Sequence, residues 1–211
     1  AGTGNMGGAG NWTFNILEFY LPDCGNYTTT ATGTGSITVN GTLSVASCFN
    51  LENFEHTLDA GPKTWIITGT GTPITTNGRI TGGTSTFRYT GAGATTIDTM
   101  DGVVLDGSYY NLEIKPSSTA THTLPVAGDL DINNNLVIGD GTNAATLSGT
   151  DNNPSLDIGG SISCAATGTN SIATGTGTWQ VSGDLDLTNC ALTATTVHTF
   201  DFDGTAKSVT A

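Results

Sequence analysis

Short strand-like segments recur along this sequence at nearly regular spacing, and this repetition leaves few folds open to the chain. Each segment alternates apolar and polar residues and is followed by glycine, asparagine or threonine. Successive segments lie 20 to 28 residues apart. The apolar residues that mark them are Phe14, Ile37, Trp65, Phe87, Tyr110, Leu130, Leu156, Trp179 and Phe200.

A repeat of about 23 residues has room for three short strands and three turns, which is one coil of a solenoid. The segments "GSITVNGTLSV" (35–45) and "GDLDINNNLVI" (128–138) place apolar residues at the same positions, as expected for copies of one repeat. We predict an all-β fold, a parallel β-helix (β-solenoid) of about nine coils, in a single domain over residues 1–211. A β-sandwich or jelly roll is the alternative, because each coil contains more than one strand.

The composition supports an all-β chain. Threonine and glycine dominate it, with 30 glycines among 211 residues, and no window shows a sustained helical period. Threonine, β-branched and aromatic residues favour strands, whereas glycine and asparagine supply turns.

The charge and the hydropathy of the sequence argue against nucleic acid as a partner and against membrane insertion. The formal net charge is -13, and the basic residues are only five and scattered. They are Lys63, Arg79, Arg88, Lys115 and Lys207. Binding to nucleic acid needs clustered lysine and arginine, so we expect no nucleic-acid partner, and no run is long and apolar enough to predict membrane insertion. An acidic chain of this kind fits an extracellular or cell-surface location.

Four cysteines can pair in three ways, and their spacing favours one of them. Cys24 and Cys48 are 24 residues apart and Cys164 and Cys190 are 26 apart, so each pair would lie on adjacent coils. Two local disulfides indicate an oxidising exterior. Four buried free thiols are the alternative, and the spacing does not match a structural zinc site.

The two ends of the sequence resemble halves of one repeat. The final stretch "TFDFDGTAKSVTA" (199–211) begins like "STFRYTGAGATTI" (85–97) but is cut short, and the Gly-rich start (1–13) adds about the missing length before the strand at Phe14. Neither end shows a capping segment, so we expect residues 1–13 to form a junction completed by a neighbouring copy. The predicted assembly residues are Phe14, Asn15, Ile16, Phe200, Phe202 and Val209. A segment cut from a long repetitive surface protein is the alternative.

Several segments carry a resemblance to a known class of proteins. "TGTGTWQVSGDLDLTN" (174–189), "STFRYTGAGATTI" (85–97), "TFDFDGTAKSV" (199–209) and "SYYNLEI" (108–114) resemble the Gly/Thr-rich repeats of large bacterial or archaeal cell-surface proteins, including adhesins with β-helix folds. The resemblance implies a structural or adhesive extracellular role, and it brings no catalytic residues.

The carboxylates are the only candidates for metal binding. Three D-x-D pairs are present, Asp129/Asp131, Asp184/Asp186 and Asp201/Asp203, and alternate strand residues share one face, so we expect these pairs to point outward and Leu130, Leu185 and Phe202 inward. Such pairs are weak candidates for calcium, and no other cofactor is predicted. The motifs of β-helix hydrolases are missing from the sequence, so we expect no enzymatic activity.

Two kinds of minor site remain. His56, His122 and His198 lie beside no nucleophile pattern and are expected on the surface or in turns. Three sequons make Asn11, Asn26 and Asn40 candidates for glycosylation.

Two functional hypotheses follow from these patterns. The first is a structural subunit of an extracellular filament or surface assembly, whose copies polymerise head to tail by pairing the C-terminal strand with the N-terminus of the next copy. The second is a cell-surface adhesin or carbohydrate-binding module, with glycans as partners.

Overall fold

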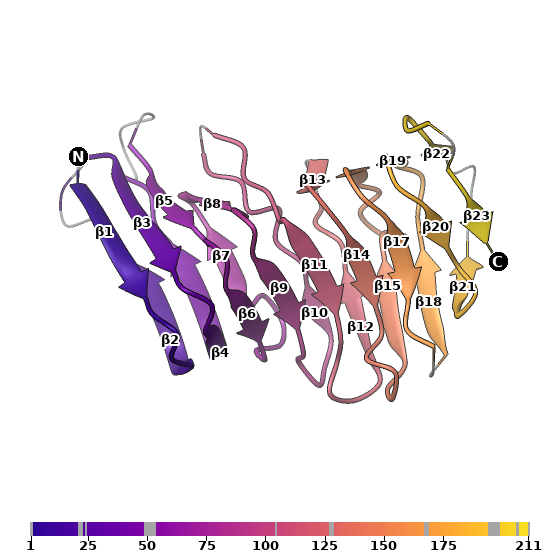
Figure 1. Ribbon diagram of the computed structural model, residues 1–211, viewed down its shortest axis with the longest axis horizontal. Coiled ribbons are helices and arrows are strands. Elements are labelled where there is room, and N and C mark those ends of the chain that lie inside the picture. Colours follow the sequence, from indigo (N-terminus) through magenta and orange to yellow (C-terminus); the bar gives the residue numbers. More distant parts are fainter. Residues whose placement is uncertain are drawn as a thin grey trace.

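The chain forms a stack of short parallel strands along one long axis, as seen in a computed structural model (Figure 1). The structure describes residues 2–20, 23, 25–48, 54–103, 105–126, 129–166, 169–193, 199–205 and 207–210. All described elements are strands and all strand ladders are parallel, so the prediction of a parallel β-solenoid is confirmed. About eight turns are present, close to the nine expected, and strands β22 and β23 begin a further one.

Three faces run along the solenoid. The first face carries β1 (Gly2–Gly7), β3 (Tyr27–Thr32), β5 (His56–Asp59), β8 (Arg79–Thr81), β13 (Asp129–Ile132), β16 (Ser155–Ile158), β19 (Thr178–Val181) and β22 (Thr199–Asp201). Its two halves are joined by the parallel bridges Thr81–Ser108 and Tyr109–Ile132.

The second face is one continuous sheet from end to end. It carries β2 (Trp12–Phe19), β4 (Ser36–Val45), β6 (Thr64–Ile67), β9 (Thr86–Tyr89), β11 (Asn111–Ile114), β14 (Leu136–Ile138), β17 (Ile162–Cys164), β20 (Leu185–Asp186) and β23 (Val209–Thr210). The third face carries β10 (Thr95–Thr96), β12 (Ala120–Thr123), β15 (Ala145–Ser148), β18 (Asn170–Ala173) and β21 (Cys190–Thr193). β7 (Ile74–Thr76) pairs with the second half of β4.

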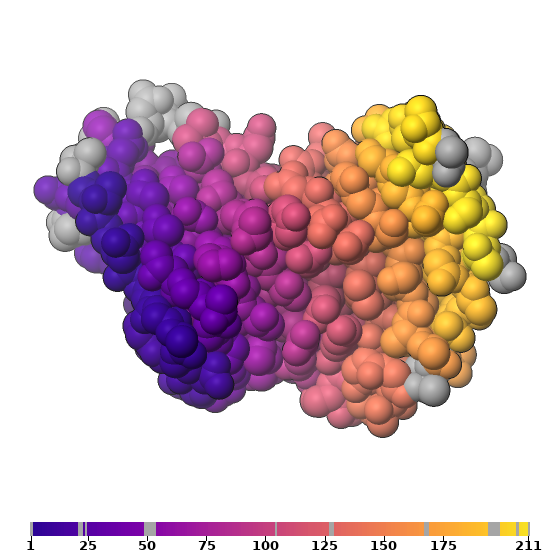
Figure 2. All heavy atoms as spheres, in the orientation of Figure 1, coloured from indigo at the N-terminus to yellow at the C-terminus, as the bar shows by residue number. Residues whose placement is uncertain are grey.

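A single apolar core fills the interior, and strands such as β6, β9 and β11 alternate buried and outward residues. The alternation also confirms that Leu130 and Leu185 face inward, while the flanking aspartates of these D-x-D pairs face outward. Phe202 packs half-buried against the same core. Each turn contacts its neighbours along the axis, and the sequence colours in Figure 2 follow one another in order from end to end.

Glycines with positive φ shape the corner between the first and second faces in the early turns. Gly33 has φ 76° and Gly61 has φ 59°, a region that residues with a side chain rarely adopt. A Cβ atom at Gly61 would lie 1.7 Å from the carbonyl oxygen of Ala31 in the preceding turn. Only glycine therefore allows the turns to stack this closely at this corner.

The regular segments of the sequence do not all belong to one face. Phe14, Ile37, Trp65 and Phe87 lie on the second face, whereas Leu130, Leu156, Trp179 and Phe200 lie on the first. The shortest spacing in the series, from Tyr110 to Leu130, marks the change of face. The described part of the chain contains no helix with the length and hydropathy needed to cross a membrane.

Candidate functional site

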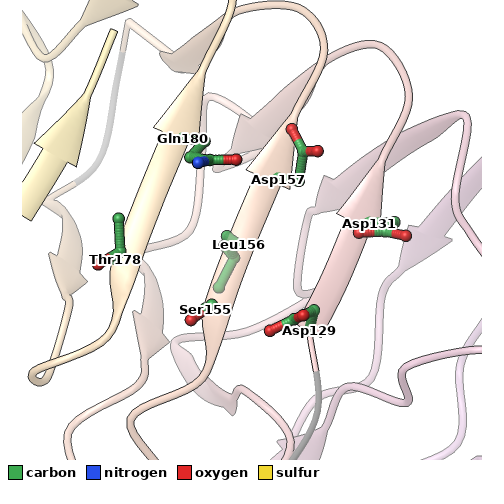
Figure 3. A pocket seen from close by; sticks show the side chains of 7 residues that line it. All are labelled: Asp129, Asp131, Ser155, Leu156, Asp157, Thr178 and Gln180. Atoms are coloured by element: carbon green, nitrogen blue, oxygen red, sulfur yellow. The ribbon is translucent and has the colours of Figure 1, made fainter. Parts of the chain in front are cut away.

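The outer surface of the first face carries a shallow acidic hollow. Asp129, Asp131 and Asp157 project from β13 and β16, and Gln180 projects beside them from β19 (Figure 3). The ladder pairs Asp131 with Asp157 and Asp157 with Gln180, and the hollow encloses about 270 Å³. Ser155 and Thr178 complete its polar lining.

Like charges crowd this hollow. Partial burial raises the pKa of Asp131 above its ordinary value, and the nearby carboxylates of Asp157, Asp101, Asp129 and Asp106 raise it further. Among the described residues, no group of three or more histidine, cysteine or acidic side chains is arranged to hold a metal ion. Calcium binding stays a prediction.

The other predicted carboxylates are divided between two faces. Asp201 lies in the first-face ladder opposite Gln180, and Asp203 accepts a hydrogen bond from the Ser182 hydroxyl at 2.7 Å. Asp184 precedes β20 on the second face and Asp186 is its last residue, and each accepts a hydrogen bond from a backbone N–H. These bonds are the main reason that the pKa of the Asp184 carboxyl lies below its ordinary value, whereas for Asp186 the Thr188 hydroxyl contributes most. The pattern D-x-D therefore does not define one site.

The two described histidines are buried, so the expectation of surface or turn positions is wrong for them. His56 shares a hydrogen bond of 2.9 Å between its Nε2 and the Thr29 hydroxyl. His122 lies inside the third face, and neither of its ring nitrogens has a hydrogen-bond partner among the described residues. Burial lowers the pKa of both, that of His122 to about 4. His198 lies outside the described residues.

One predicted disulfide is confirmed. Cys164 at the end of β17 bonds to Cys190 at the start of β21, so the bridge joins two successive turns. Cys48 is also disulfide-bonded, and Cys24 lies outside the described residues. The three sequon asparagines, Asn11, Asn26 and Asn40, are exposed, and their glycosylation stays a prediction.

A buried lysine ties the first three turns together, which sequence reasoning missed. Lys63 is 2% exposed, and its ammonium donates to the carbonyl oxygens of Gly8 at 3.0 Å and Gly35 at 3.5 Å. These two carbonyls belong to the first and second turns, and Lys63 belongs to the third. Since its neighbours in sequence are glycine, proline and threonine, no local pattern marks it as different from a surface lysine.

Replacing Lys63 with methionine should lower the free energy of unfolding by about 2 kcal/mol, because two charge-assisted hydrogen bonds are lost while the aliphatic stem is kept. Chemical denaturation measures this loss. Lys115→Met is the matched control: the Lys115 ammonium forms a surface ion pair with Glu113 at 3.1 Å, so its removal should cost less than about 1 kcal/mol. Equal losses in the two variants would contradict the bridging role of Lys63.

The N-terminal end is an open edge. Among the strands that the structure describes, β1 and β2 are each the first of their sheet and have a pairing partner on one side. Trp12 is 37% exposed, although its ladder partner Ile37 is buried. Ile16 is 57% exposed and is aligned with the partly buried Thr42. Phe14 and Met6 are partly buried and pack against the core.

The C-terminal end is open in the same way. β21, β22 and β23 are each the last strand of their sheet (Figure 1). Val209 is 61% exposed, although its ladder partner Leu185 is buried. Phe200 and Phe202 are partly buried against the core, with ring centroids 6.3 Å apart. Five of the six predicted assembly residues are apolar and lie in or beside the terminal strands: Phe14, Ile16, Phe200, Phe202 and Val209. The sixth, Asn15, is exposed between Phe14 and Ile16.

Comparison with protein-family models, with curated protein sequences and with solved structures gives no significant match for this chain.

Proposed function

We propose that this chain is a structural subunit that polymerises head to tail into an extracellular filament or surface assembly. One observation carries the proposal: at both ends, positions that are buried in every inner turn expose apolar side chains beside unpaired strand edges. Val209 and Trp12 lie at the two ends of the same inward column of the second face.

Edge pairing explains how such ends would be satisfied. An unpaired strand edge offers backbone N–H and C=O groups to any strand of matching direction. Both ends of this solenoid include parallel strands of the first and second faces, so on these two faces the trailing end of one copy can pair with the leading end of the next. A contact between two different surfaces does not close on itself, and it therefore propagates into a fibre.

The disulfide and the net charge support an extracellular location. The Cys164–Cys190 disulfide suits an oxidising environment. The net charge of -13 favours solubility of the free subunit, and its repulsion is screened by salt, so assembly should be sought at physiological ionic strength or above.

Electron microscopy of the purified full chain tests the proposal. Wild-type protein should form fibres, and Val209→Asp should abolish them because a carboxylate is placed in the apolar column at the joint. Val126→Asp is the matched control, since Val126 is 75% exposed but lies after β12 in the middle of the solenoid. A wild-type chain that stays monomeric, or a Val209 variant that assembles like the Val126 variant, would overturn the proposal.

An adhesive or carbohydrate-binding role is the second candidate. The hollow lined by Asp129, Asp131, Asp157 and Gln180 favours it, because carboxylates accept hydrogen bonds from sugar hydroxyls and the glutamine amide can both accept and donate them. Isolated short rods in the micrographs, together with glycan binding that Asp157→Ala removes, would support this role instead.

A further inference from the structure

The corner where each second-face strand begins holds an unbroken column of polar residues. These residues precede, in each turn, the ladder that begins at Trp12 and ends at Val209. We call them the corner ladder: Asn11, Ser36, Thr64, Thr86, Asn111, Asn135, Ser161, Asp184 and Ser208.

Side chains of the corner ladder bind the backbone of the following turn. The side-chain oxygen of one member accepts the N–H of the next, from Ser36 to Asn11 at 3.0 Å and from Asn135 to Asn111 at 3.4 Å. The same bond recurs in the last turns, where the donors Ser161, Asp184 and Ser208 each reach the preceding member at 2.9 to 3.0 Å.

The carbonyl of each later member is bound as well. Leu112, Leu136, Ile162 and Leu185 donate their N–H groups to the corner carbonyl of the following turn, each at 3.0 Å. The last of these acceptors is the carbonyl of Ser208. From Asn135 onward, each following turn therefore offers its corner residue's N–H to a side chain and its C=O to a backbone N–H. In the middle turns the N–H groups of Thr86 and Asn111 instead donate to the backbone carbonyls of Lys63 and Ser85.

The same hydrogen-bond pattern can be extended beyond each end of the corner ladder. The last turn presents the Ser208 hydroxyl as the next acceptor and the Val209 N–H as the next donor, and both residues are exposed. The first turn begins the ladder with Asn11, whose side chain already bonds to Ser36.

The number of residues in the corner between the first and second faces also suits a joint between the last turn of one copy and the first turn of the next. Ladder positions on the first and second faces are five residues apart in the eighth turn, from Gln180 to Leu185. The separation is eight in the final turn, from Asp201 to Val209, and seven in the first turn, from Asn5 to Trp12. The final corner is thus closer in length to the first turn of the chain than to the turn beside it.

The inward side chains of the two ends are complementary in size when Asp201 of one copy is set opposite Asn5 of the next. On the first face, the alignment of Asp201 with Asn5 sets Phe200 over Gly4 and Phe202 over Met6. Gly4 has no side chain to oppose the Phe200 ring, and a Cβ atom at Gly4 would meet nothing closer than the Thr29 hydroxyl at 4.0 Å. Met6 and Phe202 are both half-buried against the core, and a thioether packs well on an aromatic ring.

We infer that successive copies join in one register: β23 pairs in parallel with β2 of the next copy, Val209 opposite Trp12, and the Ser208 hydroxyl accepts the N–H of the next copy's Asn11. On the first face, β22 pairs with β1, Asp201 opposite Asn5. The inference rests on the proposed function, and it names the partner surface as the β1–β2 end of a second copy of this chain.

A disulfide scan of the full-length chain tests the register. Thr210 and Thr13 are outward neighbours in it, with Cα atoms about 5 Å apart as in any parallel ladder. The double variant Thr13→Cys with Thr210→Cys should give disulfide-linked dimers and longer oligomers on mild oxidation. The two positions lie at opposite ends of one solenoid, so the bond cannot form within a chain (Figure 1).

Asn15→Cys with Thr210→Cys is the matched control. Asn15 is also exposed on β2 but lies two residues further along, which puts the Cα atoms about 8 Å apart, beyond the reach of a disulfide. Fibres in which the control pair cross-links, or in which neither pair does, would overturn the register while leaving assembly intact. A wild-type chain without fibres would overturn both.

The corner bond has its own readout. Ser208→Ala should raise the protein concentration needed for fibres by about fivefold, because Asn11 loses one hydrogen bond at each joint. Ser155→Ala makes the same change on the outer surface of β16, within the body of the solenoid, and should leave that concentration unchanged. Equal behaviour of the two variants would overturn the corner bond.

Discussion

Replacing Trp65 with alanine is expected to lower the free energy of unfolding by about 4 kcal/mol. Trp65 is fully buried, its ring stacks on Phe87 with centroids 5.6 Å apart, and its indole nitrogen donates to the carbonyl of Ala60 at 3.1 Å. The substitution removes the stack, leaves a cavity and strands the carbonyl. Because a solenoid turn is held by its neighbours, hydrogen exchange should accelerate more in β1 to β4 than in β15 to β21.

Trp12→Ala is the matched control for this prediction. Trp12 belongs to the same ladder column as Trp65, but it lies at the open N-terminal end and is 37% exposed. At concentrations where the chain is monomeric, its loss should cost about 1 kcal/mol, since much of its surface already contacts water. Denaturant unfolding measures the loss of stability in both variants. Equal losses in free energy of unfolding would contradict the position of Trp65 in the core.

Acid should destabilise the protein through His122 by roughly 3 kcal/mol between pH 7.5 and pH 4. The pKa of His122 is lowered to about 4 by burial, against an ordinary value near 6.5. At pH 7.5 both folded and unfolded chains hold the neutral ring. As the pH falls below about 6.5, the unfolded chain binds a proton that the folded chain refuses, so the free energy of unfolding drops by about 1.4 kcal/mol per pH unit until the folded pKa is reached.

The variant His122→Leu isolates this effect. The register partner of His122 in the next turn is the buried Leu147, so leucine suits the column. The stability difference between the variant and the wild type should grow by roughly 3 kcal/mol over this pH range. The comparison is needed because burial raises the pKa of Asp98, which acts in the opposite direction as the pH falls. Parallel pH profiles for the two proteins would show that His122 is solvated in the folded state.

The fold was accessible from the sequence because its main determinant is periodic. Alternating segments at a spacing near 23 residues predicted parallel coils, and the spacing of Cys164 and Cys190 predicted their disulfide. Both inferences depend on chain length per turn, which a sequence displays directly.

The assignment of segments to faces was not accessible. The segments 35–45 and 128–138 match in their apolar positions, yet β4 lies on the second face whereas β13 and β14 lie on the first and second. All eight matched apolar positions are buried, so the pattern reports burial and not the face. The similarity between the strands at Phe87 and Phe200 has the same limit, since these residues also lie on different faces.

The polar residues that hold the turns together were even harder to predict from the sequence. The members of the corner ladder are asparagine, serine, threonine and aspartate, which are also the ordinary residues of loops in this composition. Only the ladder register shows that they stand one above another. Lys63 and His122 are similar cases, because burial of a single polar side chain depends on contacts between distant residues that no local pattern reveals.

The direction of the ladder hydrogen bonds has a mechanical consequence. They run between turns on each of the three faces, so a pull along the long axis loads the ladders of the different faces together instead of shearing one of them. Tension at the C-terminal end meets a covalent link, since the bond from Cys164 to Cys190 carries force across the seventh and eighth turns without relying on their hydrogen bonds. Extension under load should therefore begin among the turns that this crosslink does not join.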